Sequence, residues 1–369
     1  MKSILALLVI LALGFYFFSL NFVVTILCIS FLIFFHELGH FLAAKHMGVK
    51  VEVFSIGFGQ VLFQKTFKGT DYRLSALPLG GYVKLKGQDD FDIKHKSYDK
   101  DSYTILSPLK KIYILLAGPL FNIILAFMLY IIIGNLGLQK IAPVVGEVLE
   151  NSAAQRANLQ KGDLIVSIDG KPVRSFDEIS KLLSLNTMSV ELIRDDKLIT
   201  VSITPSLKQA YNEFLQLTQR PQIGIQAKTD ELITVKHTGL NSLIFAYEES
   251  LNATTLIVKA LAKLVIGELD PKNLGGVITM ADVTSRAADM GIVAVLLISA
   301  LISINLGVVN LLPIPMLDGG HIVFNLYELV FKKSVPFAVF EKLSYVGLAF
   351  LLCLMVFATY NDIVRLSLN

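Results

Sequence analysis

Charged residues are scarce in this chain. They make up 17% of its 369 residues, whereas hydrophobic residues make up 54% and the mean hydropathy is +0.63. Soluble globular proteins carry about 25% charged residues, so this sequence has too few to cover a surface that faces water on all sides. The apolar residues are concentrated in a few long runs, which indicates that part of the chain is solvated by lipid.

Cysteine is also rare, and a large excess of either charge is missing. Cys28 and Cys353 are the two cysteines, both lie in apolar runs, and no Cys-x-x-Cys pair is present, which excludes a metal site built on such a pair. We expect both thiols to pack as small apolar side chains. The formal net charge of +3 is too small to indicate nucleic acid as a partner.

The apolar runs are candidates for membrane crossings, each of which needs about 20 residues in a helix. The first run is almost continuous from Ile4 to Phe35, and we interpret it as two crossings, 3–18 and 22–45. One long tilted helix is an open alternative. A secretory signal peptide is another, although no small-residue cleavage site follows the first run. Further crossings are expected at about 112–136, 291–312 and 343–360.

Basic residues between the second and third crossings indicate the orientation. Segment 45–111 contains eleven lysines and Arg73 against seven acidic residues, and short loops rich in Lys and Arg stay on the cytoplasmic side. Lys2, Lys332 and Lys333 then fall on the same side. The long polar region from about 138 to 290 is therefore expected to be extracytoplasmic.

The sequence His36-Glu37-Leu38-Gly39-His40 is an H-E-x-x-H motif at the end of the second expected crossing. Residues four apart lie on one face of a helix, so both imidazoles can reach one ion. The Glu37 carboxylate projects beside them, where it can accept a proton from water at the metal. Ionisable side chains at membrane depth are costly unless they are paired or bind a metal, which favours a metal site over two histidines that merely pack in a core.

A second polar site at membrane depth follows about 280 residues later, in Asn310-Leu-Leu-Pro313-Ile-Pro315-Met-Leu-Asp318-Gly-Gly. The two prolines cannot continue a regular helix. Broken backbone at this depth is tolerated only where protein or a water cavity satisfies its polar groups, so we expect Asp318 to face a polar interior as the third ligand. Two imidazoles and one carboxylate suit a tetrahedral Zn²⁺ site with an open position. His321 is the alternative ligand, and a helix-capping role for Asp318 is the structural alternative.

Two regions between the crossings have the patterns of small α/β structures. Residues 51–63 and 72–85 are interrupted by turn glycines and are expected to form short strands. From Pro143 to about Pro205 the pattern predicts a strand, a short helix, a second strand, a helix beginning near Ser175 and a final hairpin, which resembles one PDZ domain. The stretch 240–269 is expected to form one or two amphipathic helices, either at the outer membrane surface or packed beneath the PDZ domain.

Together these motifs resemble the site-2 protease family of intramembrane zinc metalloproteases, in its bacterial RseP-like branch with a PDZ domain. The resemblance runs nearly end to end, through His36–His40, Phe54–Gly59, Ala117–Asn122, the PDZ-like region and Asn310–Asp318. H-E-x-x-H alone occurs in many metalloproteases, whereas its joint occurrence with N-x-x-P-x-P-x-L-D-G is specific. The expected crossing at 3–18 departs from the four crossings associated with the family.

The resemblance implies a role for each residue of these motifs. His36, His40 and Asp318 would bind Zn²⁺, and Glu37 would be the general base and proton shuttle. Asn310 would contact the substrate backbone or the developing oxyanion, with helix capping as its structural alternative. Weaker candidates for substrate binding are Asn305, Gly57 and Gly59.

The expected fold is a polytopic α-helical membrane protein of about four or five transmembrane helices, with a membrane-associated β-hairpin region and one extracytoplasmic PDZ domain. The expected segments are 1–45 with H-E-x-x-H, a cytoplasmic or re-entrant β region at 46–111, a transmembrane helix at 112–137, the PDZ domain at 138–208, an extracytoplasmic connector at 209–290, and C-terminal transmembrane helices at 291–369.

The implied activity is hydrolysis of peptide bonds within transmembrane segments, in the inner membrane of a bacterium. The implied partners are the lipid bilayer and single-pass membrane proteins, such as anti-sigma factors, or remnant signal peptides. Two alternatives from other classes are a catalytically inactive membrane adaptor with a PDZ domain and a metal-binding sensor.

Overall fold

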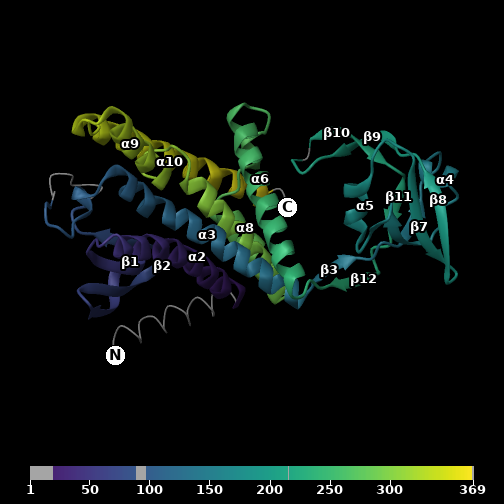
Figure 1. Ribbon diagram of the computed structural model, residues 1–369, viewed down its shortest axis with the longest axis horizontal. Coiled ribbons are helices and arrows are strands. Elements are labelled where there is room, and N and C mark those ends of the chain that lie inside the picture. The colour runs from purple at the N-terminus through teal and green to yellow at the C-terminus, as the bar shows by residue number, and fades with distance from the viewer. Residues whose placement is uncertain (1–19, 89–96, 215, 368–369) are drawn as a thin grey trace. The chain divides into compact units, whose positions relative to one another are not determined.

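The computed structural model describes residues 20–88, 97–214 and 216–367, and the chain divides into two compact units (Figure 1). The helical unit contains the described residues before 133 and after 242, and the β unit contains residues 133–242. The expected crossing at 3–18 lies outside the described residues.

Four helices of the helical unit have the length and hydropathy of membrane spans. They are α2 (Leu20–His46), α3 (Pro108–Leu136), α8 (Ile292–Asn310) and α10 (Phe337–Ser367). They coincide with the crossings expected at 22–45, 112–136, 291–312 and 343–360, although α10 is longer than expected at both ends. Large apolar side chains cover the outside of these helices, as expected where lipid is the solvent.

Shorter or more polar helices complete this unit. They are η1 (Tyr103–Ile105), α6 (Leu240–Val265), η2 (Pro271–Asn273), α7 (Val277–Met290) and α9 (Asp318–Phe331). The stretch 240–269 therefore contains one long helix, α6, whose Phe245 ring meets Tyr130 of α3 edge to face, with ring centroids 6.4 Å apart. Gly291, with φ of +104°, separates α7 from α8 in a conformation that favours glycine.

Small residues let α3 approach two other spans closely. A Cβ atom on Gly39 of α2 would lie 2.4 Å from the Ala117 carbonyl oxygen, and one on Gly307 of α8 would lie 2.9 Å from the Pro119 carbonyl oxygen. Close backbone packing through small residues is typical of membrane helices. Because of it, the middle of α3 lies beside the H-E-x-x-H turn of α2.

The strands β1 (Val51–Phe67) and β2 (Thr70–Leu85) are longer than the short strands expected at 51–63 and 72–85. Residues 53–56 pair with 81–84 on one side and with 71–74 on the other, while 61–67 pair with 70–75. The hairpin is therefore folded into a four-stranded arrangement with 81–85 at one edge. The reversal within β1 falls at Gly57 and Gly59, whose φ angles are +86° and +81°.

The β unit follows the element order expected for a PDZ domain over its first part. Its elements are β3 (Leu138–Ile141), β4 (Val145–Val148), α4 (Ala153–Arg156), β5 (Leu164–Ile168), β6 (Lys171–Pro172), α5 (Phe176–Leu182), β7 (Met188–Arg194) and β8 (Lys197–Ile203). Strands β6, β5, β7 and β8 form one sheet in that order. Its apolar core includes Ile165, Leu192 and Ile203, all almost fully buried.

The β unit continues beyond residue 208, where the expected PDZ segment ends. Strands β9 (Ser206–Tyr211) and β10 (Leu217–Gln222) form a hairpin, after which β11 (Ile225–Ala227) pairs with β4 and β12 (Leu232–Val235) pairs with β3. These pairings return the chain to the first strands of the unit. They are contacts between distant parts of the sequence, which local patterns do not predict.

The carboxylate of Asp362, near the end of α10, holds the start of α7. Asp362 is 1% exposed and accepts hydrogen bonds from the backbone N–H groups of Gly276 (3.0 Å) and Thr279 (3.0 Å) and from the Thr279 hydroxyl (2.5 Å). The first N–H groups of a helix have no partner within the helix. An acidic side chain from another helix therefore caps α7.

We predict that Asp362→Ala lowers the free energy of unfolding by about 1–2 kcal/mol, because the first N–H groups of α7 lose their acceptor. Thermal unfolding in detergent and hydrogen exchange along α7 measure the effect. Glu341→Ala, which removes an exposed acid from the same helix, is the control. Equal stabilities of the two variants would contradict the capping role.

Candidate metal centre

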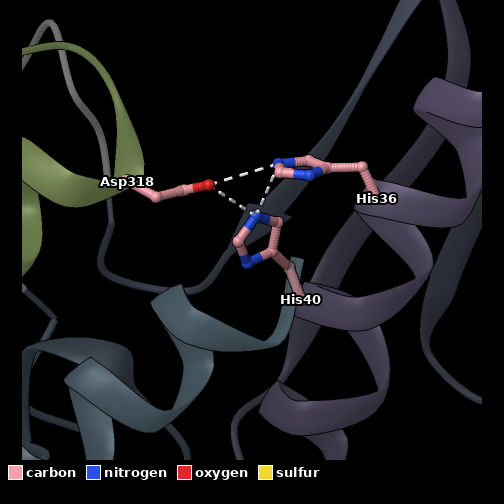
Figure 2. Close-up of side chains that lie close together, drawn as sticks. All are labelled: His36, His40 and Asp318. Atoms are coloured by element: carbon pink, nitrogen blue, oxygen red, sulfur yellow. Dashed lines mark hydrogen bonds and ion pairs between the residues drawn. The ribbon is translucent and has the colours of Figure 1, made fainter. Parts of the chain in front are cut away.

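The helix α2 places the two histidines of H-E-x-x-H one turn apart on the same face. Their rings are 4.8 Å apart at 81°, and the Nε2 atoms of His36 and His40 are 3.2 Å from each other (Figure 2). Their side chains are only 10% and 13% exposed. The spacing of the motif therefore produces the convergence expected from helix geometry.

Asp318 reaches the histidines from the first residue of α9. Its Oδ2 atom lies 3.2 Å from Nε2 of His36 and 3.4 Å from Nε2 of His40 (Figure 2). Among the described residues these three side chains form a group that could hold a metal ion. Residues separated by nearly the whole sequence thus converge on one point.

The chain before Asp318 is bent sharply, and glycines make room for it. Met316 has φ of +78°, a conformation that costs a non-glycine residue free energy and that often occurs at functional sites. A Cβ atom on Gly319 would lie 2.2 Å from the Leu312 carbonyl oxygen, and one on Gly320 would lie 2.3 Å from that of Ile314. Only glycine fits where α9 turns back against this loop.

The three donor atoms have the separations that a zinc ion requires. Zn–N and Zn–O bonds of about 2.0–2.1 Å place the ligand atoms of a tetrahedral site about 3.3 Å apart. The three distances here are 3.2, 3.2 and 3.4 Å. The donor set of two imidazoles and one carboxylate also leaves one tetrahedral position open, as in catalytic sites.

Both imidazoles are oriented by contacts with α3 through their other ring nitrogens. Nδ1 of His40 lies 2.9 Å from the carbonyl oxygen of Ile114, which accepts its proton and leaves Nε2 free to bind a metal. Nδ1 of His36 lies 3.2 Å from Nδ2 of Asn122, a fully buried side chain.

The Asn122 side chain fits a metal-bound His36 when its amide is rotated. Its Oδ1 is buried without a hydrogen-bond partner. Because the nitrogen and oxygen of an amide are exchanged by a 180° rotation, Oδ1 can take the place of Nδ2 and accept the Nδ1 proton of His36. The rotation pairs Oδ1 with the Nδ1 proton of His36 and fixes the His36 tautomer that can bind a metal through Nε2.

Gly118 of α3 lies directly against the two rings. A Cβ atom at this position would lie 2.2 Å from Nε2 of His40 and 2.9 Å from Cε1 of His36. A larger residue would displace both imidazoles. Glycine is therefore required at position 118, because any side chain there would clash with the two histidine rings.

A cavity of about 330 Å³ adjoins the three side chains. Glu37 and Asn310 line it, and the Nδ2 atom of Asn310 lies 3.5 Å from Nε2 of His36. Val83, in the edge strand 81–85, lines the same cavity as Glu37. The cavity therefore brings together the histidines, a carboxylate, an amide and a strand.

The weaker candidates from the sequence lie elsewhere. Asn305 is half-buried in α8, and neither it nor Gly57 or Gly59 lines the cavity. The positive φ angles of both glycines have a structural reason in the reversal of β1, and a substrate contact by these three residues stays a prediction. His321, the alternative ligand, lies among phenylalanines, 5.8 Å from the Phe340 ring, and is not in the group of three.

Asn122 is the site residue that the sequence did not single out as functional. It stands in Ala117–Asn122, which contributed to the family resemblance but has no ligand-type chemistry of its own. Asn122 lies five residues after Ala117 in α3, and this position in the sequence does not indicate a contact with α2. Only the packing of α3 against α2 reveals it.

Comparison with known proteins agrees with this geometry. Residues 24–354 match Peptidase family M50. A Campylobacter jejuni protein is 59% identical over 366 residues, covering 99% of both chains. Relatives in Helicobacter pylori (37% identical, 94% of this chain and 99% of the relative) and Agrobacterium fabrum (32%, 92% and 94%) are also similar, and all three names contain the words zinc metalloprotease.

One solved structure is similar to part of the chain. It is the PDZ domain of the SdrC-like protein from Listeria monocytogenes, 25% identical, which covers 24% of this chain and 87% of that domain with a TM-score of 0.19. A TM-score of this size carries no argument about the fold.

The chain belongs to Peptidase family M50, the site-2 protease family. It is a zinc metalloprotease by the family and by its relatives over the whole chain. With its apolar helices, it is a multi-pass membrane protein.

We predict that Asn122→Ala weakens zinc binding by about 10–100-fold, the usual effect of losing a partner of a metal-binding histidine. Competition with a fluorescent zinc chelator on the purified protein measures it. Asn305→Ala is the matched control, since Asn305 is outside the cavity lining. An unchanged zinc affinity for Asn122→Ala would show that Asn122 does not support zinc binding by His36.

Proposed function

We propose that this chain is an intramembrane endopeptidase that hydrolyses peptide bonds within the membrane segments of single-pass proteins or remnant signal peptides. The observation that carries the proposal is the convergence of His36, His40 and Asp318 beside Glu37. The H-E-x-x-H residues lie in the candidate span α2, and Asp318 begins α9. Anti-sigma factors are the substrate class that the family resemblance suggests.

We assign the three converging side chains as zinc ligands and Glu37 as general base. Zinc bound there supplies a Lewis acid that makes water a nucleophile at neutral pH. The Glu37 carboxylate takes the proton of the attacking water and passes it to the leaving amine. The Glu37 side chain lines the cavity beside the three candidate ligands, where it can reach that water.

Asn310 is assigned to the substrate carbonyl. Its amide lines the cavity and lies 3.5 Å from His36, so its N–H group is able to donate to an oxygen held near the metal. A donor aimed at an oxygen on which charge develops lowers the barrier of acyl transfer. The assignment follows from position and from the chemistry of an amide.

The edge strand 81–85 is assigned to hold the substrate as an added strand. A peptide bond inside a helix has its carbonyl hydrogen-bonded and shielded, so the substrate must be locally unwound before water can attack it. Within the described residues no further strand pairs with 81–85, and Tyr82, Val83 and Leu85 line the cavity. Strand addition would present an extended peptide to the site.

The proposed location is the inner membrane of a bacterium, with the β unit on the extracytoplasmic side. The excess of lysine in 45–111 supports this orientation through the positive-inside rule. The β unit would then act on substrates outside the cytoplasm, as a PDZ domain that binds or filters them. The metal centre would lie toward the cytoplasmic side of the bilayer.

We predict that Glu37→Gln loses at least about 100-fold in cleavage rate, the usual contribution of a general base, while it retains bound zinc. Cleavage of a reporter membrane helix by purified protein, with metal analysis of the same samples, measures both. Glu248→Gln, an exposed acid of α6, is the control.

The alternative functions give different results in the same assay. Bound zinc without cleavage by the unmodified protein would favour a sensor or an inactive adaptor. Equal cleavage by Glu37→Gln and the unmodified protein would show that Glu37 is not the general base. Chelation by 1,10-phenanthroline should stop cleavage by the unmodified protein.

We predict that a substrate cysteine near the scissile bond forms a disulfide with Tyr82→Cys much more readily than with Lys65→Cys. Tyr82 lies in edge strand 81–85, whereas Lys65 is exposed on the opposite edge strand, 61–67. The experiment uses Glu37→Gln with Cys28 and Cys353 replaced by serine, and gel electrophoresis measures the cross-link. Equal cross-linking at both edges would contradict strand addition.

A further inference from the structure

We propose that the tip of the β9–β10 hairpin inserts into the headgroup region of the lipid bilayer and so anchors the β unit to the membrane surface. The hairpin tip is defined here as residues 211–214 together with 216 and 217. The proposal does not depend on the catalytic assignments, because it concerns a surface outside the metal centre.

One face of the hairpin exposes large apolar side chains beside the tip and at the base, with the exposed pair Gln209 and Gln219 between them. Strands β9 and β10 form a two-stranded sheet of their own. In its register Tyr211 pairs with Leu217 and Leu207 pairs with Pro221, so these residues share a face. Tyr211, Leu217 and Leu207 are 65%, 59% and 48% exposed. An isolated two-stranded hairpin is marginally stable in water, so a surface that covers this face would stabilise it.

Hydrogen bonds order the turn at the hairpin tip. The Asn212 side-chain oxygen accepts hydrogen bonds from the backbone N–H groups of Phe214 (2.8 Å) and Gln216 (3.0 Å). The Asn212 N–H donates in turn to the Gln216 carbonyl oxygen at 2.9 Å. These bonds fix Tyr211 and Leu217 side by side at the end of the strands, and they satisfy backbone groups that would otherwise need water.

The charges of the hairpin suit an anionic surface. The acid at the tip, Glu213, is bound by both oxygens to Arg220, with N–O distances of 3.0 Å, which offsets its charge. The strands themselves contain Lys208 and Arg220 and no acidic residue. Because Arg220 already pairs with Glu213, residues 206–222 carry a net charge of +1, which corresponds to Lys208. This charge favours approach to acidic lipids.

The connections of the β unit indicate that lipid is the occupant. The candidate span α3 ends at Leu136 and β3 begins at Leu138, so the β unit starts two residues after a membrane helix. This short tether keeps the β unit close to the membrane, which makes the lipid surface available to cover the exposed face of the hairpin. A tyrosine with leucines is the composition that accumulates at membrane interfaces.

The absence of tryptophan from the chain allows a direct test. Tyr211→Trp introduces a single tryptophan, which is excited selectively at wavelengths where tyrosine does not absorb. The full-length protein is placed in nanodiscs of phosphatidylethanolamine and phosphatidylglycerol, with or without brominated acyl chains. Leu198→Trp is the matched control, since Leu198 is a 64% exposed apolar residue of β8 in the same unit. Leu217→Trp serves as a second probe of the tip should Tyr211→Trp fold poorly.

Insertion predicts a blue-shifted emission and at least about twofold stronger quenching by brominated lipid at residues 211 and 217 than at residue 198, since only the tip would reach the acyl boundary. Equal quenching at all three positions would overturn the proposal. A blue shift at residue 211 without quenching by brominated lipid would also overturn it, because it would indicate a protein partner or a second copy of the chain on this face.

Discussion

The meeting of one carboxylate with two imidazoles inside a membrane protein is the contact on which the rest of the helical unit depends. Lipid offers no hydrogen bonds, so ionisable groups at this depth must find partners within the protein. Asp318 lies within 3.4 Å of both Nε2 atoms, and it comes from a part of the chain far from α2. The contact therefore requires a defined arrangement of α2, α9 and the broken loop between α8 and α9.

The helix α3 makes that arrangement possible without supplying a ligand. Gly118 leaves space for the rings, while Ile114 and Asn122 hold their outer nitrogens. The Ser303 hydroxyl of α8 donates a hydrogen bond to the backbone carbonyl oxygen of Asn122 at 2.7 Å. This bond connects α8 to the same turn of α3. A metal centre with this support needs little rearrangement when it binds its ion, and pre-organised ligands bind metal more tightly.

Much of this organisation could be predicted from sequence because it rests on local rules. Helix geometry places the two histidines of H-E-x-x-H, both candidate ligands, on one face of α2, and the prolines before Asp318 interrupt the helix through their own backbone chemistry. The described spans followed from hydropathy to within a few residues, except that α10 extends further at both ends. The longer strands of the β1–β2 hairpin and the return of β11 and β12 to the first strands of the β unit depend on pairing between distant residues, which composition does not encode.

The difference between local patterns and contacts between distant residues also explains why the sequence did not indicate the contact of Asn122 and where His321 lies. Asn122 has no metal-ligand chemistry, and its contact with His36 arises only when α3 packs on α2. His321 has suitable chemistry three residues after Asp318, but α9 turns it toward Phe324 and Phe340. The sequence favoured Asp318 over His321 as the third candidate ligand, and the fold brings Asp318, not His321, into the group with the two histidines.

Zinc stoichiometry of the purified full-length protein with Asp318→Ala and with His321→Ala tests the account most directly. If Asp318 completes the centre, Asp318→Ala loses tightly bound zinc, whereas His321→Ala keeps one zinc per chain, as the unmodified protein does. Full zinc occupancy in Asp318→Ala, or its loss in His321→Ala alone, would contradict the proposed metal centre.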